Sequence, residues 1–124
     1  GRYFCLETLS AQDGKPYAAI AELDLLDAAG KPLSHEGWTI AYVDSEERER
    51  EDGTAENAID GQVANFWHTQ WGGASPNHPH RLVLDLGQTR EIAGFRYVPR
   101  QGAGAVGGRI KEYRIYVGDG LVRK

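Results

Sequence analysis

The chain has 124 residues, 40% of them hydrophobic, and a formal net charge of −4. That length suits one domain, because a chain of this size buries roughly two-thirds of its unfolded surface around one core. An acidic balance without a basic stripe among aromatics argues against a nucleic-acid partner. The apolar runs are too short to span a membrane, and the first residues do not have the pattern of a signal peptide.

Segments with the composition and alternation of β-strands recur along the chain, with turn signals between them. They are Arg2–Leu9, Ile20–Leu26, Trp38–Val43, Arg81–Leu86, Ile92–Val98 and Ile110–Val117. The first two flank the turn-like Asp13–Pro16, so we expect a hairpin with a long loop. Leu82, Leu84 and Leu86 share one face of their strand. The pattern predicts an all-β fold, an antiparallel β-sandwich or jelly roll.

Two segments do not have the strand pattern, and one residue within a strand-like run has a separate interpretation. Ser45–Asp52 is a charged run, which predicts a solvated loop or a short helical turn. Asn57–His80 is too long for an idle connection in a small domain, so we expect it to be functional or anchored. Cys5 is the single cysteine and lies in a strand-like run, so we expect a small buried hydrophobic residue without a disulfide partner in the chain.

A turn within this long segment has the oxygen ligands that a hard cation needs. Asp60 precedes Gly61, and Gln62 and Asn65 follow, so that one carboxylate, side-chain amides and free carbonyls lie close together. This spacing suits calcium, although it is not an EF-hand loop. An ordinary Asp-Gly turn explains the same residues, and both interpretations stay open at this point.

The histidines raise the alternative of a zinc-dependent hydrolase. His68, His78 and His80 lie within thirteen residues. However, Pro79 holds two of them on a rigid segment, and no cysteine or HExxH pattern accompanies them. The chain has no nucleophile turn, and the acidic side chains of its charged run lack apolar surroundings. We therefore expect a non-catalytic domain.

Loop residues favour recognition of a polar, uncharged ligand instead. Tyr17, His68 and Arg100 fall in segments that read as loops. Sugars bind an aromatic face with their C–H side, while polar side chains fix their hydroxyls. Each residue also has a purely structural explanation. Tyr17 would be an ordinary turn residue, His68 would support the fold through hydrogen bonds, and Arg100 would be a surface charge.

Several motifs follow one another in an order typical of a known family. They are Ala58–Gly61, Phe66–Thr69, Pro79-His80, Asp85–Gly87, Gly94–Tyr97, Pro99–Gln101 and Gly108–Tyr113. This order, over about residues 37–120, resembles discoidin-type (coagulation factor V/VIII C-type) domains and especially family 32 carbohydrate-binding modules. The resemblance implies a galactose-binding-domain-like sandwich that recognises a galactose-like or related glycan. It also implies a module appended to a larger secreted enzyme or surface protein.

The order of the segments differs from that of the family. Residues 1–27 resemble the C-terminal end of such a module, residues 28–36 read as a linker, and residues 37–124 resemble the body. A circular permutation or a piece cut across tandem modules would explain this order. Strands that such modules normally have after Gly120 are missing. Tandem modules or a strand-exchanged dimer would cover the open sheet edge.

The resemblance implies a structural calcium ion and a set of ligands for it. Its ligands would be the side chains of Glu22, Asp60 and Asn65 and the carbonyls of Ala21, Asn57 and Gln62. Asn65 departs from the usual threonine, but its amide oxygen can still serve. A calcium role would also explain a carboxylate in an otherwise apolar strand.

The resemblance also implies a sugar site. In it Tyr17 would be the stacking platform, His68 and Arg100 would bind hydroxyls, and Glu51 would be a nearby acid. Galactose-binding members carry Asn where this chain has Gly107, so galactose specificity is an open question. We expect Trp67 and Trp71 to be core or loop-anchoring residues.

The resemblance predicts an extracellular or cell-surface location, with glycan as the partner and no role for a membrane. The alternative function is a discoidin-type domain for protein or membrane adhesion. Such domains display apolar or basic spikes at their loop tips, and Gly102–Val106 is too small to be one.

Overall fold

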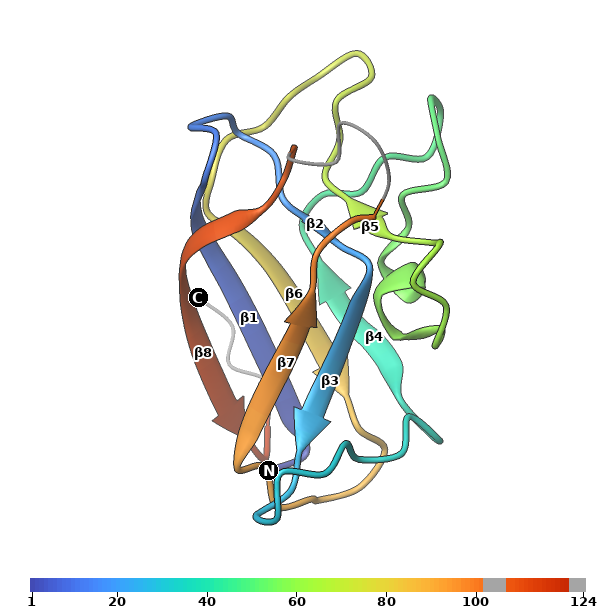
Figure 1. Cartoon of the computed structure of the whole chain (residues 1–124), viewed down its shortest axis with the longest axis vertical. Helices are drawn as coiled ribbons and strands as arrows, with labels where there is room; N and C mark the ends of the chain where they lie inside the picture. Colours follow the sequence, from blue (N-terminus) through green and yellow to red (C-terminus); the bar gives the residue numbers. More distant parts are fainter. Residues whose placement is uncertain (102–106, 121–124) are drawn as a thin grey trace.

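The fold is an all-β sandwich, which confirms the fold class expected from the sequence. The computed structural model describes residues 1–101 and 107–120. Its elements are β1 (Tyr3–Ala11), β2 (Ala19–Ile20), β3 (Glu22–Leu26), β4 (Thr39–Val43), the 3₁₀-helix η1 (Ala55–Ile59), β5 (Trp67–His68), β6 (His80–Asp85), β7 (Gly94–Val98) and β8 (Ile110–Gly118) (Figure 1). Each of the expected strand segments overlaps a strand.

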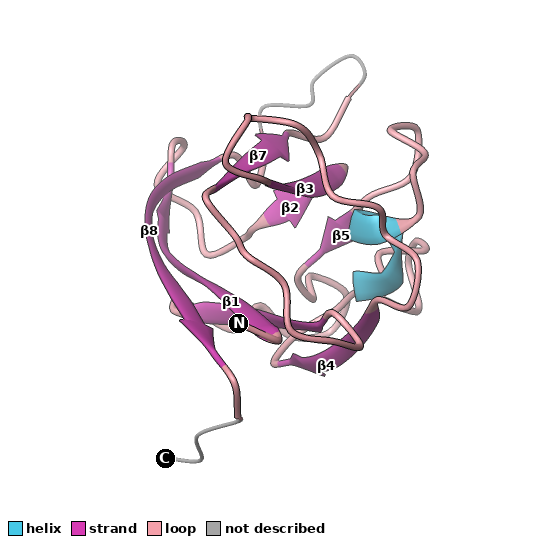
Figure 2. Ribbon diagram, turned by 90° about the horizontal axis from the view of Figure 1, so that it is seen from below, coloured by secondary structure: helices cyan, strands magenta, loops and turns pink. Residues whose placement is uncertain are grey.

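The strands form antiparallel sheets that pack as two layers. The larger sheet has four strands in the order β4-β6-β1-β8, and the pairs β3-β7 and β2-β5 form the other side. Figure 2 shows these two layers from one end of the molecule. The first strand lies in the interior of the larger sheet, where Leu6 pairs with Leu82 on one side and Ile115 on the other. Residues 1–27 and the body therefore build a single sandwich.

The expected hairpin of the first two strand segments is wrong. β1 pairs with β6 and β8, whereas β3 pairs with β7 in the opposite layer. The chain crosses from one layer to the other between them, and there the backbone N–H of Ala19 donates to the Gly108 carbonyl. Alternation identifies a strand but not its partner, and a sandwich can place consecutive strands in different sheets.

The core lies between the layers and is built from the inward positions of the alternating strands. Leu82, Leu84 and Leu86 are fully buried, as their spacing predicts, and they pack with Phe4 and Leu6. Each such side chain contributes about 1.5–3 kcal/mol on burial. The rest of the buried cluster comprises Ala18, Ile20, Leu23, Leu25, Trp38, Ala55, Ala58, Trp67 and Ile110.

One side of the sandwich is open. Tyr113 and Val117 face the same way as buried Phe4 and Leu6, yet each is 49% exposed. The opposing β3-β7 pair covers the inner face of β8 only in part, where Phe95 packs edge-on to Tyr113 with ring centroids 5.5 Å apart. Cys5 lies on the outer face of β1 and is half-buried, so its expected place in the core is wrong. Partial burial nevertheless raises the pKa of its thiol.

Candidate functional site

A buried carboxylate organises the loops at one end of the sandwich. Glu47 lies in the charged run, but its side chain is only 1% exposed. Its oxygens accept hydrogen bonds from the backbone N–H groups of Glu49, Arg50, Trp71 and Gly72, at 2.6–2.9 Å. The prediction of a solvated loop is therefore wrong for Glu47, because the carboxylate joins two loops that lie more than twenty residues apart in the chain.

The electrostatics of Glu47 follow from these donors. The N–H groups favour the ionised form and hold the pKa of the Glu47 carboxyl at about 2, although burial opposes them. Glycine is required where the loops meet, because a Cβ on Gly72 would lie 2.5 Å from Cγ of Arg50 and 3.1 Å from a Glu47 oxygen. The loop that carries Trp71 is thus fixed in place by backbone contacts with a buried charge.

Three of the predicted sugar-binding residues come together beside these loops. The ring of Tyr17 lies 5.5 Å from that of His68, and Phe66 packs edge-on to the same imidazole. The guanidinium of Arg100 stacks over Phe66 at 4.8 Å from the ring centroid. The arrangement places an aromatic ring, an imidazole and a guanidinium in one connected group. Phe66 is the member whose role the sequence reasoning missed.

His68 has one nitrogen left for a ligand. Its Nδ1 lies 2.6 Å from the carbonyl oxygen of Thr69, an acceptor, so this nitrogen carries a proton. Its Nε2 has no hydrogen-bond partner among the residues that the structure describes. In the neutral tautomer this nitrogen accepts a hydrogen bond. The side chain is 5% exposed and held by Gly53, where a Cβ would lie 3.2 Å from that of His68.

Hydrogen bonds of Tyr17 and of the preceding residue hold Tyr17 in this group. Its hydroxyl lies 3.1 Å from that of Ser75. The preceding carbonyl, of Pro16, accepts from Nε2 of His80, and Nδ1 of His80 faces Asp44. Burial alone would lower the pKa of His80, but Asp44 and the Pro16 carbonyl outweigh it and raise the pKa. The stabilisation that charged His80 provides is therefore fully present below the ordinary histidine pKa. It is lost as the pH rises through the raised pKa of His80.

The predicted acid Glu51 takes part in a different contact. Its Oε1 accepts a hydrogen bond of 2.7 Å from the indole Nε1 of Trp71. Trp71 is 37% exposed and therefore anchors a loop without entering the core. Trp67, in contrast, is fully buried and donates from its Nε1 to the Ser45 carbonyl.

Most of the predicted calcium ligands surround one turn. The N–H of Gly61 donates to both oxygens of Glu22, at 3.1 and 3.2 Å. Asp60 accepts 2.8 Å hydrogen bonds from the N–H of Gln62 and the side-chain amide of Asn65. Gly61 has a φ of +77°, which favours glycine at this position. Two carboxylates and the amide side chain of Asn65 thus lie together, and such oxygen donors fit a hard cation.

The other two predicted calcium ligands are the backbone carbonyls of Ala21 and Asn57. The side-chain Nδ2 of Asn57 donates to Asp52 and to the Phe66 carbonyl, which fixes the residue whose backbone carbonyl was predicted as a ligand. Ala21, which precedes Glu22, donates its N–H to the Val98 carbonyl. These contacts fix the backbone on either side of the turn.

Glu22 also belongs to a cluster that the sequence reasoning missed. His35 lies between two carboxylates, with Nδ1 3.4 Å from Glu22 and Nε2 2.9 Å from Asp24. Arg96 pairs with the other oxygen of Asp24 at 2.7 Å. Among the described residues, Glu22, Asp24 and His35 form the group of acidic and histidine side chains that lie close enough to share a metal ion. Asp24 shares the Glu22 face of β3, a spacing visible in the sequence.

Burial leaves Glu22 short of positive charge. Its side chain is 6% exposed, and burial raises the pKa of its carboxyl to about 7, even though His35 and the Gly61 N–H favour the charged form. A bound cation would supply the missing charge. The histidines weighed above for the alternative of a zinc site have other partners: His78 faces Thr8 and the Lys15 carbonyl, and His80 faces Asp44 and the Pro16 carbonyl.

Comparison with known proteins shows the family of the chain. The F5/8 type C domain family matches residues 41–121, well over half of the chain. The chain belongs to the F5/8 type C domain family. This confirms the discoidin-type resemblance, and the matched region contains η1, the Asp60-Gly61 turn, His68 and Arg100.

The relatives of this F5/8 type C domain are larger enzymes. A sialidase of Micromonospora viridifaciens is 42% identical over 118 residues, covering 94% of this chain and 17% of that protein. A galactose oxidase of Gibberella zeae is 31% identical over 111 residues, covering 87% of this chain and 16% of that protein. An A type blood N-acetyl-alpha-D-galactosamine deacetylase of Flavonifractor plautii is 32% identical over 65 residues, covering 52% and 8%. The chain thus spans about a sixth of the first two relatives.

In the part of the chain that the structure describes, no helix has the length and apolar character needed to cross a membrane. The segment Gly102–Val106, considered above as a loop-tip spike, lies outside the described residues.

Proposed function

We propose that this F5/8 type C domain is a non-catalytic carbohydrate-binding module for a galactose-like or related glycan. The carrying observation is the connected group of Tyr17, Phe66, His68 and Arg100, in which His68 keeps a free Nε2 and Arg100 stacks on Phe66. Aromatic rings suit the C–H face of a sugar, and the imidazole and guanidinium suit its hydroxyls.

The site acts by shape and hydrogen bonding. Tyr17 is the stacking platform, His68 accepts a hydroxyl proton, and Arg100 donates to sugar oxygens. Glu51, which already binds the Trp71 indole, lines the approach. A shallow single site gives a dissociation constant on the order of 0.1–1 mM, about 4–5.5 kcal/mol. Repetition in tandem modules would raise the apparent affinity without new contacts.

Calcium is part of this proposal. The ion would be held by Glu22, Asp60, Asn65 and the carbonyls of Ala21, Asn57 and Gln62. Support comes from the buried Glu22, whose raised pKa shows a shortage of positive charge, and from the carboxylates gathered at the Gly61 turn. The ion would brace the loop that leads through Phe66 to His68.

The biological setting is proposed from the relatives. They include a sialidase and a galactose oxidase, and this chain covers only about a sixth of each. We infer a targeting module of a larger secreted enzyme or surface protein, located outside the cell. The open edges of β7 and β8 suit tandem modules or a strand-exchanged dimer as neighbours.

Glycan-array binding followed by titration calorimetry tests the sugar site. We expect Tyr17→Ala and Arg100→Ala to weaken binding of the best array ligand at least 10-fold. Matched controls are Tyr42→Ala and Arg114→Ala, which remove an exposed tyrosine and an exposed arginine from the larger sheet. Retained binding in the first pair would rule out this site. Binding of anionic vesicles without any glycan binding would support the adhesion alternative.

A further inference from the structure

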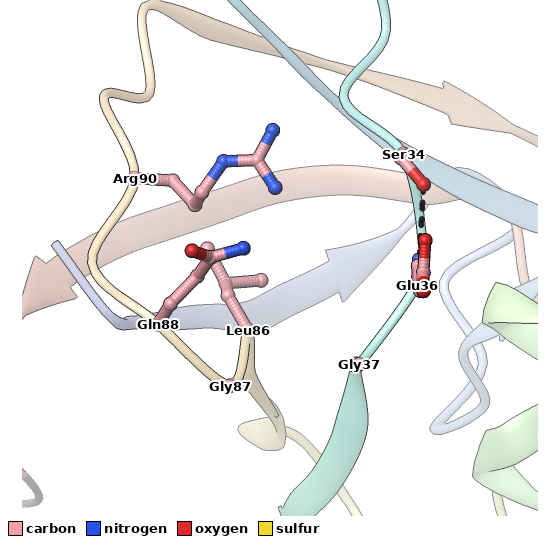
Figure 3. Close-up of a pocket in the computed structure, with 7 residues that line it drawn as sticks. All are labelled: Ser34, Glu36, Gly37, Leu86, Gly87, Gln88 and Arg90. Carbon is pink, nitrogen blue, oxygen red and sulfur yellow. Dashed lines mark hydrogen bonds between the residues drawn. The ribbon is translucent and has the colours of Figure 1, made fainter.

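A second polar hollow lies at the opposite end of the sandwich from His68. Figure 1 shows the segments that follow β3 and β6 together at the end away from β5. They enclose a hollow of about 390 Å³ lined by Ser34, Glu36, Gly37, Leu86, Gly87, Gln88 and Arg90 (Figure 3). This volume falls in the range of small-molecule sites, about 300–1,000 Å³. None of these residues belongs to the sugar or calcium site proposed above.

The close approach of Gly37 and Gly87 fixes the shape of this hollow. Gly37 and Gly87 have φ values of +83° and +78°, and a Cβ on Gly87 would lie 2.8 Å from the Gly37 carbonyl oxygen. The backbone N–H of Leu86 donates to the Arg2 carbonyl, and that of Arg90 donates to the Gly1 carbonyl. The two walls therefore meet backbone to backbone, and the second wall is tied to the start of β1.

The side chains around the hollow have unused hydrogen-bonding capacity. Arg90 and Gln88 extend from one wall towards the segment of Ser34 and Glu36 on the other (Figure 3). Within residues 1–101 and 107–120, the guanidinium of Arg90, the amide of Gln88 and the carboxylate of Glu36 have no hydrogen-bond or ion-pair partner. Ser34 Oγ accepts from the Glu36 N–H at 3.2 Å and keeps its own proton to donate.

We propose that this hollow binds a hydroxylated carboxylic acid, the chemistry of a sugar acid. A guanidinium binds a carboxylate through two parallel N–H donors, so Arg90 takes the acid group. The Glu36 carboxylate on the other wall accepts protons from hydroxyls, and Gln88 and Ser34 serve the remaining oxygens.

The pair of opposite charges selects among ligands. A simple anion satisfies Arg90 but brings no donor for Glu36. A neutral sugar satisfies Glu36 but leaves Arg90 without a charged partner. A ligand that has both a carboxylate and hydroxyl groups uses both walls at once. A free sugar acid and the acidic end residue of a glycan share this chemistry.

Amide chemical-shift mapping with the ¹⁵N-labelled chain tests the proposal. Galacturonic acid and N-acetylneuraminic acid should shift the amides of residues 34–37 and 86–90 with millimolar dissociation constants. Acetate and galactose should each bind this end at least 10-fold more weakly. An oligosaccharide with an acidic end residue distinguishes a glycan-bound source from a free one.

Variants separate this site from the proposed sugar site. Arg90→Gln should weaken acid binding at least 10-fold and Glu36→Gln about 3-fold, while both leave the shifts caused by neutral ligands near His68 unchanged. Arg90→Lys keeps the charge without the two-donor geometry and should fall between. Any one of three results would overturn the proposal. They are equal binding of acetate and the sugar acids, undiminished binding of the sugar acids by Arg90→Gln, and acid-induced shifts confined to residues 17, 66–68 and 100. The amide spectrum of each variant reports whether it is folded.

Discussion

Glu22 and Glu47 are both buried, but the pKa values of their carboxyls are shifted in opposite directions. Glu47 receives backbone N–H donors from two loops, and its pKa falls to about 2. Glu22 receives one backbone N–H and a histidine, and its pKa rises to about 7. Backbone amides alone can therefore stabilise one buried carboxylate, whereas the other requires a positive charge from elsewhere. One loop is braced by the protein itself and the other by a proposed ion.

Removal of the Glu47 charge should have the largest effect on the fold. In Glu47→Gln, two acceptor oxygens become one oxygen and one amide that faces N–H donors, so buried donors lose their partners. We expect the thermal midpoint to fall on the order of 10 °C, measured by circular dichroism. Glu49→Gln, two residues away and exposed, is the control and should change the midpoint little. An equal change in both variants would contradict the assigned role.

Calcium should stabilise the domain through the other loop. At a free concentration about 100 times the dissociation constant, a ligand specific to the folded state adds about 2.7 kcal/mol. The thermal midpoint should therefore rise by several degrees with calcium and fall again with chelator. Glu22→Gln should abolish this response, whereas Glu56→Gln on η1, an exposed acid, should keep it. A domain indifferent to calcium, or one that purifies with zinc, would refute the calcium proposal.

Acid should affect the Glu47 loops only at very low pH. The pKa of Glu47 is depressed from 4.5 to about 2, so its contribution to stability is complete above pH 4.5 and is lost as pH falls towards 2. The amide signals of Trp71 and Gly72, which donate to this carboxylate, should titrate with a midpoint near 2. A midpoint near 4.5 would show that these hydrogen bonds are not maintained in solution.

Amide hydrogen exchange should distinguish the loop around Gly61 from the loops held by Glu47. Chelation of calcium should speed exchange at the Gly61 and Gln62 amides about 10-fold, because these residues form the turn around the proposed ion. The Trp71 and Gly72 amides, held by Glu47, should exchange at the same rate with and without calcium. If both loops loosened together, they would form one cooperative unit and the contrast between them would be lost.

The sequence predicted the elements of this fold better than their partners. Leu82, Leu84 and Leu86 identified β6 because alternation is local, but the layer that each early strand joins depends on contacts with residues far along the chain. Glu47 could not be found in its charged run, because its burial depends on Trp71 and Gly72, more than twenty residues away.

Some of the residues that the sequence assigned to one site also lie close together in the structure. Tyr17, His68 and Arg100 were predicted as one group and do lie together, as do the acids around Gly61. Asp24 shares a strand face with Glu22 and could have been found by the same spacing. His35 could not, since it comes from a segment that reads only as a linker and reaches the acids through the fold.

The interior position of β1 has a consequence for folding. β1 pairs with β8, Tyr3 with Gly118, and with β6, and both of these strands come much later in the sequence. Such distant pairings are slow to form, because a long loop must close before any contact is made. The emerging chain must therefore hold a strand with both edges unpaired until β6 and β8 leave the ribosome, and in that interval β1 is exposed to aggregation.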